Sequence, residues 1–214
     1  MGVIPTIAPF LLPDALVALR TRYPKLMLSL REDITTNLLS RLEAGQLDLA
    51  LIALPCATGN LLVEPLFDDE LWIIGLKNDP QVQPRQIKVT PSISDRLMLL
   101  EEGHCLRDHA LAACGTNPDH PHNKIETTSL MTLVQMVESG LGVGLIPEMA
   151  LRSGLMDSPN LLSRPLAKPT LKRTIALVAR PSTARQRDIK ALAGILQAAG
   201  TTHKAHKSHA RRTA

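Results

Sequence analysis

Residues 97–115 read LMLLEEGHCLRDHALAACG, and the order of residue types predicts a strand, a loop and a helix. Leu97–Leu100 is an apolar run of strand length, whereas Leu106–Cys114 consists mainly of good helix formers. Gly115 follows at the position where a glycine commonly ends a helix. In open α/β sheets, functional sites form beyond the carboxyl ends of strands. We therefore expect an α/β fold with a site at the start of this helix.

Cys105 lies at the expected N-terminus of the helix, with His104 and Arg107 close to it in sequence. The positive end of the helix dipole and these two side chains favour the thiolate, which is the form that attacks. An unperturbed cysteine, with a pKa of ~8.5, is only a few per cent thiolate at neutral pH. Cys114 is a second thiol that could capture an oxidised Cys105. Inert cysteines that act as small buried hydrophobes are the alternative interpretation.

Strand and helix patterns alternate on both sides of this stretch and predict sheets covered by helices. The expected strands are Gly2–Ile7, Leu26–Leu30, Leu47–Leu54, Glu70–Leu76, Val143–Ile146 and Lys172–Ala179. The expected helices are Pro13–Tyr23, a segment from an N-cap at Thr35 or Thr36 to Gly45, a segment from Ser129 to Gly140, and Asp188–Ala198. Cys56 is expected in a loop just beyond a strand, as an inert thiol.

Composition excludes some functions. The 214 residues carry a net charge of +4, but four of the 24 basic side chains lie in the last fourteen residues, and the remaining 20 balance the 20 acidic ones. The basic surface is therefore expected only in a tail. Aromatic residues make up 2% of the chain, too few for the stacking surfaces that bind single-stranded nucleic acid. Neither a signal peptide nor a membrane-spanning run is indicated, and three cysteines do not suggest a secreted disulfide framework. We expect a cytoplasmic protein without contact with a membrane.

Gly-His-Cys-Leu-Arg-Asp at residues 103–108, followed by Cys114, resembles the redox motif of the hydrogen-peroxide-sensing LysR-type transcriptional regulators. Ala113 and Gly115 depart from a member of this family in which aromatic residues flank the second cysteine. This departure concerns the packing of Cys114 and not the presence of the thiol pair. Further matches to the family's regulatory domain cover about residues 2–200 and are Ile4-Pro5-Thr6, Leu11-Leu12-Pro13, Tyr23-Pro24-Lys25-Leu26, Pro65-Leu66-Phe67-Asp68, Thr127-Thr128-Ser129-Leu130 and Arg173-Thr174-Ile175.

The resemblance implies a sensor and not an enzyme. Cys105 would be oxidised by hydrogen peroxide to sulfenic acid and would then form a disulfide with Cys114. The supporting residues of the motif would be His104, Arg107 and Asp108. The resulting change of conformation and oligomer arrangement would control the transcription of antioxidant genes.

Thr6 and Thr35 match family positions that are associated with a peroxide pocket. From the residues alone, an ordinary strand-end or helix-capping threonine is the preferred interpretation of each. The resemblance also implies partners: hydrogen peroxide, a second copy of the chain in a homodimer, a tetramer in the full-length protein, promoter DNA and RNA polymerase. DNA would be bound by an N-terminal winged helix-turn-helix domain, and nothing in these residues resembles one. No cofactor and no metal are expected.

The implied fold has two Rossmann-like subdomains of the periplasmic-binding-protein type. Subdomain I would comprise residues 1–72 and 175–200, and subdomain II residues 73–174 with the redox cysteines. The chain would cross near residue 72 and return near residue 174. Residues 201–214 would form a disordered basic tail.

Two other functions are compatible with parts of the sequence. A LysR-type effector domain could bind a small organic ligand in the cleft between the subdomains, with inert thiols. A metal site could recruit nearby histidines and cysteines, although their spacing fits no usual zinc pattern. The residues of this third hypothesis are His104, Cys105, His109, Cys114, His120 and His122.

Overall fold

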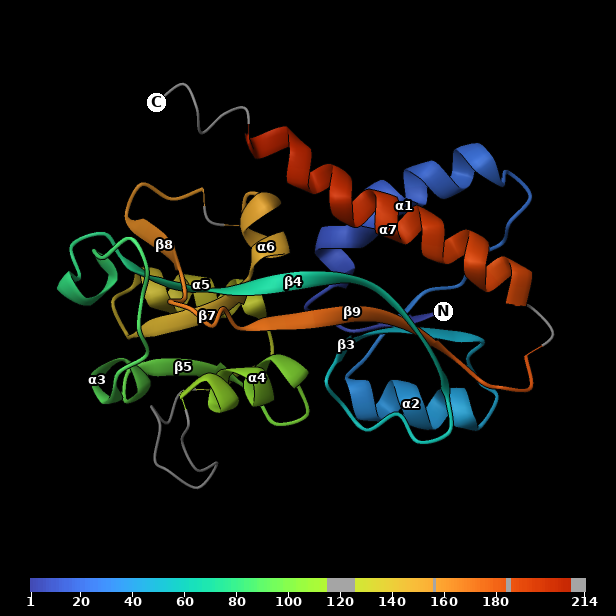
Figure 1. Ribbon diagram of the computed structural model, residues 1–214, viewed down its shortest axis with the longest axis horizontal. Coiled ribbons are helices and arrows are strands. Elements are labelled where there is room, and N and C mark those ends of the chain that lie inside the picture. The colour runs from blue at the N-terminus through green and yellow to red at the C-terminus, as the bar shows by residue number, and fades with distance from the viewer. Residues whose placement is uncertain (115–125, 156, 184–185, 209–214) are drawn as a thin grey trace. The chain divides into compact units, whose positions relative to one another are not determined.

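The computed structural model describes residues 1–114, 126–155, 157–183 and 186–208. The chain forms two compact units, each of mixed α/β structure. Unit 1 comprises Met1–Asp68 and Thr174–Ala214, and unit 2 comprises Asp69–Arg173. The chain passes between them in β4 (Leu62–Leu76) and β9 (Lys172–Ala179) (Figure 1).

In unit 1 the strand order is β2-β1-β3-β9, with β1 parallel to both of its neighbours and β9 antiparallel to β3. Helices α1 and α7 pack against each other, and Figure 1 shows α2 on the opposite side of the strands. The apolar centre of β3 and most of β9 are buried, and they form the core of the unit. The bounds are β1 Gly2–Val3, α1 Ala8–Arg22, β2 Arg31–Glu32, α2 Thr35–Glu43, β3 Leu49–Leu54 and α7 Gln186–Ser208.

In unit 2 the order is β8-β4-β7-β5-β6. Strand β5 is parallel to β6 and β7, and β4 is antiparallel to β7 and β8. All residues of β5 and β7 are buried, because helices α4 and α5 pack against β5 and helices α5 and α6 pack against β7. The bounds are η1 (3-10) Pro80–Val82, α3 Pro91–Ser94, β5 Leu97–Leu100, α4 Cys105–Cys114, β6 Glu126–Thr127, α5 Leu130–Glu138, β7 Val143–Pro147, α6 Glu148–Arg152 and β8 Leu161–Pro165.

Three expectations for unit 1 were wrong. Helix α1 begins at Ala8 and not at Pro13, because Pro9 occupies the first turn and Pro13 is accommodated inside the helix. Leu26–Leu30 is not a strand: only the two residues of β2 pair with the equally short β1, and Met27 is 95% exposed. Helix α7 continues to Ser208, so residues 201–208 are helical where disorder was expected.

The unit boundaries also differ slightly from the expected crossings. Strand β4 begins at Leu62 instead of Glu70, and the first crossing falls inside this continuous strand, after Asp68. The second crossing follows Arg173. None of the described helices combines the length and the apolar character that a membrane span requires.

Candidate functional site

Cys105 is the first residue of α4, directly beyond the carboxyl end of β5. Gly103 has a φ of 92°, a left-handed conformation that glycine adopts without strain and that turns the chain from strand to helix. The side chain of Cys105 is buried, with 6% of its surface exposed. The helix begins one residue earlier than expected, so the thiol lies within the first turn, where the backbone dipole favours negative charge.

His104 and Asp108 flank this thiol in the sequence but differ in environment. His104 is buried, and burial lowers its pKa against the opposing effect of Glu101, so the ring is neutral at pH 7. Asp108 is exposed on the first turn of α4. Partial burial raises the pKa of its carboxyl, and Arg107 acts in the opposite direction.

Arg107 connects α4 to the sheet. Its guanidinium donates to the carbonyl oxygen of Leu100 at 3.1 Å and forms an ion pair with Glu126 of β6. The sequence suggested that this charge would act on Cys105, and this role stays a prediction, since the observed contacts of Arg107 are with Leu100 and Glu126. These contacts of Arg107 hold α4 against the ends of β5 and β6.

Cys114 is the last residue of α4. Nine residues separate it from Cys105, and at ~1.5 Å of rise per residue a helix holds the two α-carbons ~13.5 Å apart. The structure therefore places the two thiol-bearing residues at opposite ends of one helix. The expected stop at Gly115 lies outside the described residues.

The remaining predicted residues lie in unit 1. Thr6 and Thr35 are both buried and follow the carboxyl ends of the neighbouring parallel strands β1 and β2. Thr35 is the first residue of α2 and not its N-cap, which is Ile34. Its hydroxyl group has no hydrogen-bond partner among the described residues. Cys56 is half-buried just beyond β3, at the expected position.

A buried charge pair in unit 2 was missed by the sequence reasoning. Arg173 is fully buried and donates from Nε and Nη2 to Asp69 Oδ2, each at 3.1 Å. The other carboxylate oxygen of Asp69 accepts the backbone N–H of Met149 at 3.0 Å, at the start of α6. Burial raises the pKa of Asp69, while Arg173 and this N–H favour the carboxylate. The pair joins the first and last residues of unit 2.

His109 is a second buried histidine on α4 and lies one turn beyond Cys105. Neither ring nitrogen has a hydrogen-bond partner within the part of the chain that the structure describes. Burial, and then the positive charge of Arg173, lower the pKa of His109 to about 4. The ring is therefore neutral at pH 7.

Among the described residues, no three His, Cys, Asp or Glu side chains are grouped so that they could hold a metal ion. Of the six residues in the metal hypothesis, His120 and His122 lie outside the described ranges.

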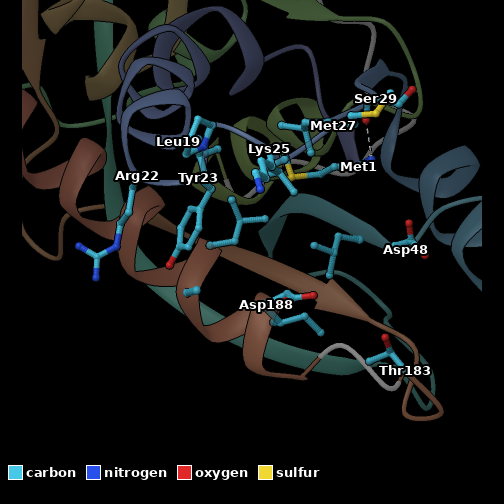
Figure 2. A pocket seen from close by; sticks show the side chains of 17 residues that line it. Met1, Leu19, Arg22, Tyr23, Lys25, Met27, Ser29, Asp48, Thr183 and Asp188 are labelled. Atoms are coloured by element: carbon cyan, nitrogen blue, oxygen red, sulfur yellow. Dashed lines mark hydrogen bonds between the residues drawn. The ribbon is translucent and has the colours of Figure 1, made fainter.

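Unit 1 also contains a hollow with a cavity volume of ≈ 600 Å³. It lies between the end of α1, the segment that follows it and the start of α7 (Figure 2). Most of the lining is apolar and includes Leu19 and Leu192, with Arg22, Asp48 and Asp188 among its charged members. None of the predicted redox residues lines it.

Comparison with known proteins identifies the family. The family of LysR substrate binding domains matches residues 1–201. The chain belongs to this family. It is therefore a transcription-regulator domain of mixed α/β, periplasmic-binding-protein-like fold, and not an enzyme, which confirms the expected class.

Individual relatives point to peroxide regulators. The HTH-type transcriptional regulator EstR of Acinetobacter baylyi is 38% identical over 92% of this chain and 65% of its own length. The hydrogen peroxide-inducible genes activator of Dickeya chrysanthemi is 35% identical over 86% of the chain and 60% of its length. The reduced regulatory domain of OxyR2 from Vibrio vulnificus is 39% identical, with a TM-score of 0.83 over 92% of this chain and 93% of that one. The chain thus spans less than two thirds of these curated relatives and is related to OxyR peroxide sensors.

The Asp69–Arg173 pair should be important for stability. Replacement Arg173→Met leaves the Asp69 carboxylate buried without its counter-charge, and losing one partner of such a pair costs about 3–5 kcal/mol. Urea unfolding measures this loss. The double variant Asp69→Asn/Arg173→Met should recover part of it, because the asparagine still accepts the Met149 N–H without a charge.

The matched control is Arg96→Met. Arg96 pairs with Asp79 at 2.7 Å, but its side chain is 41% exposed, so removal should cost less than about 1 kcal/mol. Equal losses for the Arg96 and Arg173 variants would show that the buried pair has no special role.

Proposed function

We propose that this chain is the redox-sensing regulatory domain of a LysR-type transcriptional regulator and that it detects hydrogen peroxide through Cys105. The observation that carries the proposal is the position of Cys105 in the first turn of α4, directly beyond the carboxyl end of β5, with Cys114 at the other end of the same helix. The helix dipole at this end favours a thiolate over a thiol. Relatives named as hydrogen peroxide-inducible genes activators support the choice of oxidant.

The proposed chemistry has two steps. The Cys105 thiolate attacks one peroxide oxygen, an S–O bond forms as the O–O bond breaks, and the second oxygen leaves as hydroxide. Sulfur is thereby oxidised to sulfenic acid while the peroxide is reduced. The Cys114 thiol then attacks the sulfenic sulfur, the disulfide forms and water leaves.

Other residues would support the first step. His104 is buried beside Cys105 and can hydrogen-bond to the peroxide as a neutral ring. Arg107 holds α4 against the sheet through its hydrogen bond to the Leu100 carbonyl oxygen. Asp108 belongs to the same motif, and its side chain is exposed to solvent. From the resemblance to the peroxide-sensing family, Thr6 and Thr35 are also proposed as peroxide-binding hydroxyl groups.

In the full-length protein, we expect the disulfide to change how the regulatory domains assemble as a homodimer and tetramer. A preceding DNA-binding domain would then contact promoter DNA differently and alter its action on RNA polymerase, which turns antioxidant genes on. The bistable element in this scheme is α4, whose ends carry the two cysteines.

Thiol mass spectrometry tests the proposal. The reduced domain is treated with substoichiometric hydrogen peroxide in the presence and absence of a sulfenic-acid trapping reagent. We expect the trap to label Cys105 first and, without the trap, a Cys105–Cys114 disulfide to accumulate. Unmodified cysteines, or labelling of Cys56 ahead of Cys105, would contradict the proposal.

A second candidate function is favoured by the hollow in unit 1. Its volume of ≈ 600 Å³ lies within the range typical of small-molecule sites, and its lining is largely apolar. The chain would then be a LysR-type effector domain that binds a small organic ligand and has inert thiols. The peroxide experiment discriminates between the two, because an effector domain of this kind would leave all three cysteines reduced.

A further inference from the structure

His109 occupies a position from which it can reach whatever reacts at Cys105. The two residues are four apart on α4, and at 100° per residue their side chains leave the helix only about 40° apart. Side chains with this spacing are neighbours, with roughly 5–6 Å between their β-carbons. Both are 6% exposed, so they share a buried side of the helix.

The two ring nitrogens of His109 can form hydrogen bonds, but they form none with the described residues. Neither nitrogen has a partner among them, although each such buried group costs about 1–3 kcal/mol when it makes no hydrogen bond. A histidine that merely filled space would be replaced with benefit by leucine, which has a similar size and no polar atoms. The unused nitrogens point instead to a small polar molecule as the partner of the ring.

The protonation state of the ring determines which hydrogen-bonding groups that molecule must have. Burial and the nearby Arg173 keep the pKa of His109 at about 4, so the ring is neutral at pH 7. A neutral imidazole donates one hydrogen bond and accepts another, whereas the charged ring can only donate. Hydrogen peroxide needs such a partner, because each of its oxygens carries both a hydrogen and lone pairs.

We infer that His109 is a further residue of the peroxide site and that its neutral ring hydrogen-bonds hydrogen peroxide while Cys105 attacks it. This inference rests on the proposed function. The ring N–H donates to the oxygen that departs, and this stabilises the negative charge that develops as the O–O bond breaks. The S–O bond forms at the other oxygen, and hydroxide leaves. The ring stays neutral throughout and transfers no proton.

The test compares His109→Leu with His109→Gln in the intact 214-residue chain. The leucine removes both ring nitrogens, whereas the glutamine amide keeps a donor and an acceptor. We expect His109→Leu to slow the second-order oxidation of Cys105 by hydrogen peroxide by about 10-fold to 100-fold, within the range of a buried hydrogen-bond donor to a developing anion. His109→Gln should retain most of the rate.

Alkylation of Cys105 by iodoacetamide, measured against pH, separates peroxide binding from effects on the thiol itself. The reagent reports the thiolate and its accessibility but has no oxygen pair for His109 to bind, so its rate and pH profile should be the same in wild type and His109→Leu. If alkylation and peroxide oxidation fall together, His109 acts on the thiol and the inference is wrong. Equal peroxide rates in wild type and His109→Leu would also overturn it.

The matched control is Leu111→Ala. Leu111 is buried on α4 but lies about 240° around the helix from Cys105, so this variant loosens the packing of the helix without removing a polar group. It should react with peroxide faster than His109→Leu. If the wild-type domain does not react at Cys105 at all, the proposed function fails and this inference fails with it, whereas a reactive wild type with an equally reactive His109→Leu removes only the inference.

Discussion

Cys105→Ser is expected to abolish the reaction of this domain with hydrogen peroxide. A serine hydroxyl group is not ionised at neutral pH and cannot be oxidised to a sulfenic acid, while the size of the side chain is almost unchanged. Cys105 lies in the first turn of α4, where the helix dipole favours negative charge, and it is the thiol that we propose as the nucleophile. The loss should be complete at one equivalent of peroxide, measured as the disappearance of both sulfenic-acid labelling and the internal disulfide.

Two other serine variants separate the roles of the thiols. Cys114→Ser should still form a sulfenic acid at Cys105, but it should not form the bridge. Cys56→Ser is the matched control, because Cys56 lies in unit 1 just beyond β3, and its replacement should change neither step. If the trapping reagent labels Cys114 in the wild-type domain, nucleophile and resolving thiol have been assigned in reverse. An unreactive Cys56→Ser would show that the wrong cysteine was chosen.

The parts of the fold that the sequence predicted well share one property, a continuous apolar run between clear breakers. Strand β5 is observed at Leu97–Leu100 and β9 at Lys172–Ala179, both as expected. Helix α2 ends at Glu43 with Gly45 at a φ of 74°, because a helix stop in the left-handed conformation is a local signal. Such elements are specified by their own residues.

The failures occur where the structure depends on a distant partner. Leu26–Leu30 has the alternating apolar pattern of a strand but no strand to pair with. The alternation alone therefore led to a wrong strand prediction. Strand β6 and helix α6, of two and five residues, are too short for any periodic pattern to predict them. They exist because β5 and Asp69, respectively, supply their hydrogen-bond partners.

The same distinction applies to the candidate site. The position of Cys105 at a helix start could be predicted from residues 97–115 alone. The contact between Asp69 and Arg173 could not, since 104 residues separate them. One signal was available: Arg173 is a charged residue near the start of an otherwise strongly apolar strand, and a buried charge requires a partner. The sequence did not single out His109 as a residue of the peroxide site. The structure does so, because its ring is buried, its nitrogens have no described hydrogen-bond partner, and burial and Arg173 lower its pKa.

Oxidation should dismantle much of α4. With Cys105 and Cys114 at its two ends, the intact helix holds their α-carbons ~13.5 Å apart, whereas a disulfide tolerates no more than ~7 Å. The backbone between them must therefore unwind or bend sharply before the bridge can close. Unwinding would disturb the buried side chains of Leu106 and Leu111, each worth about 1.5–3 kcal/mol of burial.

The disturbance should extend into the sheet through Arg107. Its guanidinium joins α4 to the Leu100 carbonyl oxygen and to Glu126. Unwinding of the helix would therefore break this hydrogen bond and this ion pair at the ends of β5 and β6. A disulfide that closes so short a loop stabilises by no more than about 3 kcal/mol, which is comparable to the burial it disrupts.

Hydrogen exchange of the reduced and oxidised domain measures this change. Amides of residues 105–114 should exchange faster after oxidation, with a smaller increase at the ends of β5 and β6, while α2 in unit 1 stays protected. Cys114→Ser treated with peroxide is the control, because it carries the sulfenic acid without the bridge and should keep the protection of the reduced helix. If wild-type protection across α4 is the same in both redox states, then a Cys105–Cys114 disulfide could exist, but it would not act by reorganising this helix.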